Sequence, residues 1–249
     1  MDVTATAPFL YPLQCCKILH LVRHAQGLHN AAAARDYASL SSTEYFDASL
    51  SPLGWQQVRD LRKQIRESGL LQRLDLVITS PLLRAMQTAV GVFGNEEQVH
   101  VLDAPELKEE NIESPTLKCP PILAIELCRE RVGPHPCDKR EAISKRRPLF
   151  PAIDFSLIES DEDNTWTGVV RETDEELAAR GLKFMNWLWT RQEKEIAVVT
   201  HHRFLQHTLN NLANDCESSV ETEIRNEFGN CELRSLVIVN KSSANVSLS

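Results

Sequence analysis

The chain has 249 residues, 42% of them hydrophobic, and 27 Lys and Arg against 35 Asp and Glu give it a formal net charge of −8 at pH 7. This acidic balance, without a run of basic residues, argues against nucleic acid as a partner, because contacts to a phosphate backbone need cations. No apolar run approaches the roughly 18 residues that cross a membrane, so no membrane partner is expected.

Strands and helices are predicted to alternate from the N-terminal region onward. An apolar run predicts a strand at residues 17–23, and a short helix is expected after Asn30. Ser51 and Pro52 suit the N-cap and first position of a helix that Gly69 would stop. Further along, strands are predicted at residues 74–79, 99–102 and 122–127, and a helix at residues 82–93.

Residues 133–172 show no strong periodicity and contain several prolines, a basic patch and an acidic run. Long irregular segments of this kind often serve as lids or binding loops. We therefore expect residues 1–249 to form a single domain with a lid-like insertion at about 133–172. Its basic patch is as compatible with binding a second anionic group of a substrate as with a solvated charged loop. The patch comprises Lys139, Arg140, Lys145, Arg146 and Arg147.

The C-terminal part continues the alternation. Thr173 and Glu176 form a capping box that begins a helix to about residue 191. A strand at 196–200, a helix at 204–212 and a strand at 233–239 follow. The pattern predicts an α/β fold, a three-layer α/β/α sandwich with a mostly parallel sheet.

Cysteine usage bears on compartment and metal binding. The seven cysteines are odd in number, and none forms a CxxC pair. Together with an N-terminus that has no basic region before an apolar stretch, this favours a reduced, cytoplasmic protein. The spacing of Cys128, His135 and Cys137 fits no common zinc site, and neither a metal nor another cofactor is expected.

Reactive side chains follow three of the predicted strands. Arg23 and His24 end the first strand, Arg84 follows the second, and His201 and His202 follow the strand at 196–200. In open parallel sheets, ligands bind beyond the carboxyl ends of the strands. Neutral imidazole is a nucleophile, and arginine matches the geometry of a phosphoryl group. The constellation therefore indicates phosphoryl transfer through His24.

Four stretches resemble the signatures of the histidine phosphatase superfamily, which has the phosphoglycerate mutase-like fold. LVRHAQG at 21–27 with Asn30 resembles R-H-G-E-T-x-x-N, and LSPLGWQQ at 50–57 resembles L-T-x-x-G-x-x-Q. SPLLRAMQT at 80–88 resembles S-P-L-x-R-x-x-Q-T, and VVTH at 198–201 resembles V-x-H. The stretches CRER at 128–131 and HPCDKR at 135–140 look most like the plant phosphoglycerate mutase-like proteins.

The resemblance implies a role for each matching residue. His24 would be the phosphorylated nucleophile, Arg23, Arg84 and His201 would hold the phosphoryl group, and Asn30 would support it. The activity implied is hydrolysis of a phosphate monoester, with a phosphorylated small molecule or phosphoprotein as substrate. Neither the physiological substrate nor the oligomeric state follows from the sequence.

The general acid has two candidates. A carboxylic acid must protonate the leaving oxygen and then activate water. The family places a glutamate soon after a strand, in an L-x-E pattern with a glycine shortly after. Glu130, which precedes Gly133, fits that pattern with a shift of one position, and Glu126 is the alternative.

Three departures from the family pattern keep other functions open. Ala25 stands where glycine is usual, Gln26 replaces a glutamate, and His202 replaces a small residue in a way that would narrow the pocket. A phosphoglycerate mutase is one alternative, although the E-R-x-Y-G-x-L-x-G-x-x-K run expected after the acid is not continued here. A catalytically impaired phosphate-binding regulatory protein is the other.

Overall fold

A computed structural model describes residues 10–95, 99, 119–213 and 218–240 of the chain. Within these residues the strands form a six-stranded sheet in the order β4-β3-β2-β5-β1-β6. Strands β1 to β5 run parallel, and β6 is antiparallel to β1. The strands are β1 (Cys16–Arg23), β2 (Leu76–Thr79), β3 (Ile122–Ala124), β4 (Ile153–Asp154), β5 (Glu195–Thr200) and β6 (Leu233–Val239).

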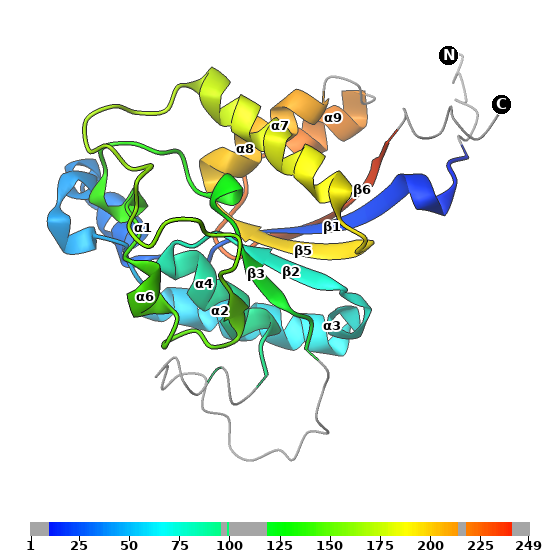
Figure 1. Cartoon of the computed structure of the whole chain (residues 1–249), viewed down its shortest axis with the longest axis horizontal. Helices are drawn as coiled ribbons and strands as arrows, with labels where there is room; N and C mark the ends of the chain where they lie inside the picture. Colours follow the sequence, from blue (N-terminus) through cyan, green and yellow to red (C-terminus); the bar gives the residue numbers. More distant parts are fainter. Residues whose placement is uncertain (1–9, 96–98, 100–118, 214–217, 241–249) are drawn as a thin grey trace.

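Helices cover both faces of the sheet (Figure 1). The helices α2 (Pro52–Glu67) and α4 (Leu83–Phe93) lie on one face, and α7 (Asp174–Thr190), α8 (His202–Ala213) and α9 (Ser218–Arg225) lie on the other. Short helices are α1 (Leu28–Ala33), α3 (Leu70–Arg73) and α6 (Ile143–Arg146). The predicted α/β/α sandwich is thus confirmed. Among the described residues, no helix is both long and apolar enough to cross a bilayer.

The continuous apolar runs of the central strands fill two cores. Val22 and Val199 point into the core shared with α2 and α4, whereas their neighbours Leu21 and Val198 point into the core shared with α7 and α8. Strands buried on both faces need apolar residues at successive positions, which explains why these strands do not alternate with polar residues.

The helix starts follow the capping signals in the sequence. Ser51 Oγ accepts a hydrogen bond from the Gly54 N–H at 3.0 Å. Thr173 and Glu176 form the expected reciprocal capping box. A Cβ at Gly54 would collide with the carbonyl oxygen of Gln26, so glycine lets the first turn of α2 sit directly on the loop that follows β1.

One predicted strand is shorter in the structure, and another lies almost wholly outside the described residues. The strand expected at 122–127 ends at Ala124, which lies opposite Thr79, the last residue of β2. Without a partner strand the chain turns, and Glu126–Cys128 forms a 3₁₀ turn. Apart from Val99, the strand expected at 99–102 lies outside the described residues.

Part of the predicted insertion belongs to the folded core. Its residues Phe150, Ile153 and Phe155 are buried in the same core as α2 and α4. β4 lies within this segment and extends the sheet beside β3. The lid role therefore stays a prediction for the residues of 133–172 outside these core contacts.

Candidate active site

Three strand ends bring the predicted residues together. Arg23 of β1 lies opposite Thr200 of β5, and Thr79 of β2 lies opposite Val199. The next residues along these strands are therefore neighbours, and the His24 N–H donates to the Thr200 carbonyl at 2.8 Å. The sheet thus holds His24 and His201 side by side, with Arg84 supplied by the first turn of α4.

Hydrogen bonds fix the tautomer of His24. Its Nδ1 lies 2.7 Å from the carbonyl oxygen of Ala25, which can only accept, so Nδ1 carries the proton. Nε2 consequently bears the lone pair, and it accepts a hydrogen bond from Arg84 Nε at 3.3 Å. The nucleophilic nitrogen therefore faces the guanidinium of Arg84.

A third histidine, which sequence reasoning missed, joins the two expected ones. The ring centroid of His24 lies 5.0 Å from that of His201 and 5.9 Å from that of His29. His29 is two residues into α1, and its only signal in the sequence was its place beside Asn30 in the first motif. All three rings are buried, as is Arg84.

Burial keeps these histidines neutral. Desolvation, followed by the positive charge of Arg84, holds the pKa values of His24, His29 and His201 well below the usual range. A neutral imidazole with a free lone pair is the form that attacks an electrophile. His24 is therefore neutral at neutral pH, which is the form that its predicted role requires.

Several buried nitrogens around His24 make no hydrogen bond with the described residues. They are both ring nitrogens of His201, Nδ1 of His29 and Nε of Arg23. Buried polar groups are normally paired, so such a cluster is suited to an anion with several acceptor oxygens. The Nη1 of Arg23 is anchored separately, because it donates to the Phe228 carbonyl at 2.7 Å.

The loop after His24 explains two departures from the family pattern. Gln26 Oε1 accepts a hydrogen bond from Ser51 Oγ at 2.7 Å, so its side chain ties the loop to the cap of α2. Ala25 is fully buried with an ordinary negative φ, so the turn accommodates its methyl group. Asn30 Oδ1 accepts from the Gly27 N–H at 3.0 Å and thereby supports the loop rather than facing the cluster with that oxygen.

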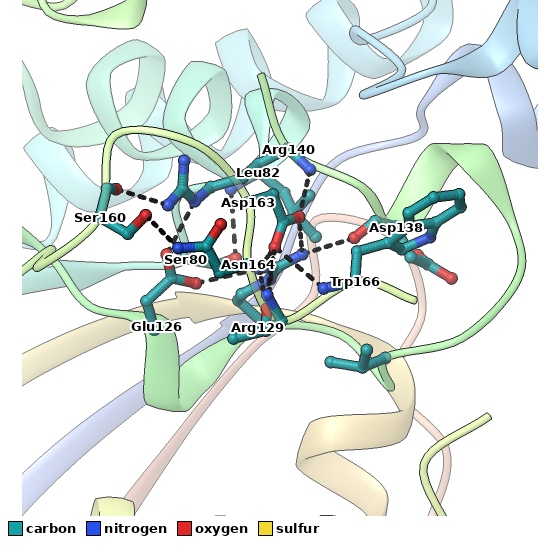
Figure 2. Close-up of polar contacts among 12 residues, drawn as sticks. Ser80, Leu82, Glu126, Arg129, Asp138, Arg140, Ser160, Asp163, Asn164 and Trp166 are labelled. Carbon is teal, nitrogen blue, oxygen red and sulfur yellow. Dashed lines mark hydrogen bonds and ion pairs between the residues drawn. The ribbon is translucent and has the colours of Figure 1, made fainter. Parts of the chain in front are cut away.

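The two acid candidates occupy different surroundings. Glu126 pairs with two buried arginines: its Oε1 lies 2.7 Å from Arg140 Nε, and its Oε2 lies 3.1 Å from Arg129 Nη1 (Figure 2). Glu130 instead accepts from the Arg131 N–H at 2.9 Å, and its charge acts on the pKa of Arg23 in the site. Of the two glutamates, Glu130 therefore has a charge that acts on Arg23, one of the phosphate ligands predicted from the sequence, whereas Glu126 is paired with two buried arginines.

His202, the third departure, begins α8 and lies half-buried beside this group. Burial lowers its pKa, the nearby Arg23 lowers it further, and the Glu130 carboxylate opposes the shift. Its Nε2 lies 3.8 Å from a carboxylate oxygen of Glu227. His202 therefore lies near Arg23 and Glu130.

Most side chains of the basic patch in the insertion contact partners within the protein. Arg140 pairs with Glu126, Arg146 Nη2 lies 2.6 Å from an oxygen of Asp47, and Lys145 pairs with Glu141. Lys139 lies over the ring of Trp166, 4.8 Å from its centroid. These partners favour a structural role for the patch over the anion-binding one.

One more acidic residue, Asp138, enters the site from the insertion. Its Oδ1 lies 3.1 Å from Arg84 Nη2, and the neighbouring Cys137 carbonyl accepts from Arg84 Nη1 at 2.5 Å. These contacts join residues more than 50 positions apart and leave no local pattern, so sequence reasoning missed them.

Known proteins resemble the chain at two levels. The model of the histidine phosphatase superfamily (branch 1) matches residues 19–114. Phosphoglycerate mutase-like protein 1 of Arabidopsis thaliana is 55% identical over 239 residues, which cover 94% of this chain and 85% of that protein. A second Arabidopsis thaliana phosphoglycerate mutase-like protein is 51% identical, over 94% of this chain and 89% of its own length.

Solved structures share the fold at low sequence identity. A putative alpha-ribazole-5'-P phosphatase from Escherichia coli superposes with a TM-score of 0.53 at 17% identity. The alignment covers 90% of this chain and 95% of that chain. This likeness supports the architecture described above.

Proposed function

The chain belongs to the histidine phosphatase superfamily, and from that membership we propose that it hydrolyses a phosphate monoester through a phosphohistidine intermediate on His24. The observation that carries the proposal is the His24 Nε2 lone pair, which lies 3.3 Å from Arg84 Nε within a cluster of buried, unpaired nitrogens. Arg23, Arg84 and His201 would hold the phosphoryl group, and Asn30 would support the loop that carries the nucleophile.

The reaction has two steps. In the first, His24 Nε2 forms a bond to phosphorus while the bond from phosphorus to the ester oxygen breaks, and Glu130 gives its proton to that leaving oxygen. In the second, the Glu130 carboxylate takes a proton from water as the water oxygen attacks phosphorus. The bond from phosphorus to nitrogen then breaks, which releases inorganic phosphate and restores His24.

Trapping the intermediate tests the proposal. Brief reaction with a ³²P-labelled phosphate ester, followed by a quench with alkaline denaturant, should leave an acid-labile phosphate on the wild-type protein. The His24→Ala variant should carry no such label and should lose about 10³-fold or more in kcat, since the covalent route is closed to it. His20→Ala is the matched control, because His20 is a buried histidine on β1, the strand that His24 follows, and its ring bonds to Ser235 and Glu195.

Two outcomes would contradict the proposal. One is a folded His24→Ala protein that turns over at the wild-type rate. The other is a wild-type protein that releases no phosphate from any member of a panel of phosphorylated metabolites and phosphopeptides. Interconversion of the two phosphoglycerates faster than phosphate release would instead favour a mutase.

A further inference from the structure

Each of the three guanidinium nitrogens of Arg84 already donates a hydrogen bond within the chain. Its Nε donates to His24 Nε2, its Nη1 to the Cys137 carbonyl and its Nη2 to Asp138 Oδ1 at 3.1 Å. The side chain of Arg84 is 1% exposed and that of Asp138 is 7% exposed. A phosphoryl group that binds Arg84 must therefore share the guanidinium with these three acceptors.

Of these three acceptors of Arg84, only Asp138 can compete with a phosphoryl group as an anion. The charged groups that act on Asp138 are Arg84 from α4, Glu130 from the segment after β3, and Arg171 from the end of the insertion. The adjacent Cys137 thiol is neutral, because burial raises its pKa to about 12. Asp138 is itself held in place, since its backbone carbonyl accepts from Arg129 Nη2 at 2.7 Å (Figure 2).

We propose that Asp138, in its ionised form, competes with the substrate's phosphoryl group for Arg84. This proposal rests on the proposed function, since it takes Arg84 to be a phosphate ligand. A carboxylate and a phosphoryl group both accept from guanidinium, and two anions on one arginine repel each other. When Asp138 binds a proton it loses that charge, and its O–H becomes a donor for a phosphoryl oxygen.

The direction of the pH dependence follows from the surroundings of Asp138. Burial raises the pKa of Asp138 to about 6, although Arg84 and Arg171 oppose the shift. Below that pH Asp138 is neutral and does not repel phosphate. As the pH rises through about 6, the carboxylate forms, and the affinity for phosphate falls relative to a protein that lacks this charge.

Binding of inorganic phosphate to the full-length protein, measured by isothermal titration calorimetry between pH 5 and 7.5, tests the proposal. The quantity to follow is the Kd of the wild type divided by the Kd of Asp138→Asn. Phosphate's own ionisation cancels in this ratio. The ratio should be close to 1 at pH 5 and rise to at most about 30-fold at pH 7.5, because each pH unit above the pKa costs up to about tenfold when binding requires the protonated form.

Asp163→Asn is the matched control. Asp163 is a buried carboxylate of the same insertion that pairs with Arg129 at 2.7 Å. Hydrogen bonds and the charge of Arg129 outweigh burial and lower the pKa of Asp163, so it remains ionised across the measured range. Removing its charge should leave the pH dependence of phosphate binding like that of the wild type. In the Glu130→Gln background the rise of the same ratio should move to lower pH, because the Glu130 charge raises the pKa of Asp138, but the rise should not disappear.

The outcomes separate this inference from the proposed function. A ratio that is constant with pH, even if it differs from 1, would overturn the role of Asp138 while phosphate binding stands. A slope that disappears in Glu130→Gln would move the titration to Glu130 and would overturn it too. Absence of phosphate binding in both the wild type and Asp138→Asn would contradict the proposed function itself. Thermal unfolding of each variant checks that the proteins compared are folded.

Discussion

Two glutamates four positions apart differ in the contacts they already make. Both carboxylate oxygens of Glu126 accept hydrogen bonds from arginines, so the charge of Glu126 stabilises the folded structure. The carboxylate of Glu130 accepts one backbone hydrogen bond from Arg131 and lies near enough to Arg23 and His202 to act on their pKa values. A general acid must release and regain a proton during turnover. This role suits Glu130, which has no arginine side chain bound to its carboxylate oxygens among the contacts described above.

Substitution by glutamine separates the two glutamates. Glu130→Gln should lower kcat by about 10²-fold or more with little change in the melting temperature, because it removes a transferable proton and keeps the shape. Glu126→Gln should cost roughly 2 kcal/mol in unfolding free energy, since two buried arginines lose a charged acceptor, with the smaller effect on kcat. Steady-state kinetics and thermal unfolding measure the two effects. The opposite order of kcat losses would reassign the acid.

At the residue scale, the sequence predicts those site residues that lie within a recognisable motif. His24, Arg84 and His201 stand at strand ends within recognisable patterns, and the structure places them together. Asp138 has no such pattern, because its contact with Arg84 depends on how the insertion folds over α4. Glu130 could be ranked above Glu126 only weakly from the sequence, since the difference lies in the arginines that Glu126 contacts.

At the scale of elements, Arg129 makes the most extensive side-chain contacts with the acidic end of the insertion. Arg129 Nη1 lies 2.8 Å from Asp163 Oδ1 and 2.6 Å from Thr165 Oγ1, and Nη2 lies 2.7 Å from Asp163 Oδ2 (Figure 2). Its side chain is 2% exposed, and the side chain of Asp163 is 1% exposed. This two-point ion pair ties the end of the insertion to the segment that follows β3.

Removing this anchor should loosen the insertion. Arg129→Ala leaves Asp163 as an uncompensated buried charge, which should cost about 3–5 kcal/mol in unfolding free energy. Urea denaturation measures this loss, and trypsin should cleave within residues 139–147 faster than in the wild type. Arg225→Ala is the control, since its partly exposed ion pair with Glu221 should contribute under about 1 kcal/mol. Equal losses in the two variants would contradict the anchoring role.

Sequence patterns predicted the elements with local signals well and missed those that depend on distant partners. Ser51 and Thr173 mark the starts of α2 and α7 where the structure has them. β4 was not expected, because Ile153–Asp154 is too short for a periodic pattern and exists through its pairing with β3. The predicted strand 122–127 was too long for the same reason, since its pairing stops where β2 stops.

At the scale of the whole molecule, the buried histidines of the site make the folded protein less stable at acid pH. His24, His29 and His201 are neutral when folded, and desolvation is the largest cause of their lowered pKa values. In the unfolded chain they take up protons below about pH 6.5. The unfolded state then binds more protons than the folded state, so stability falls as the pH falls.

Unfolding free energies at pH 7 and pH 5.5 test this dependence. The three histidines together should lower the free energy by nearly 4 kcal/mol over this interval, and the raised pKa of Asp138, which acts in the opposite direction, should offset about 1 kcal/mol. We therefore expect a net loss of about 3 kcal/mol, measured by urea denaturation. In His29→Gln, the two remaining histidines should give about two thirds of the loss of unfolding free energy that the three histidines give in the wild type. A stability that is unchanged or higher at pH 5.5 would contradict the neutral state of the cluster.

The position of β1 in the sheet has a consequence for biosynthesis. Its two neighbours are β5 and β6, and Ile18 pairs with Glu195 while Lys17 pairs with Ile238. The Cys231 N–H also lies 3.1 Å from the Arg23 carbonyl and 3.2 Å from the His24 carbonyl. On the ribosome, β1 therefore emerges as an apolar segment long before either partner strand is translated, which makes it a natural client for chaperones. His24 therefore reaches its place beside Cys231 only after translation has passed β6, so under the proposed function a nascent chain would not carry out phosphoryl transfer.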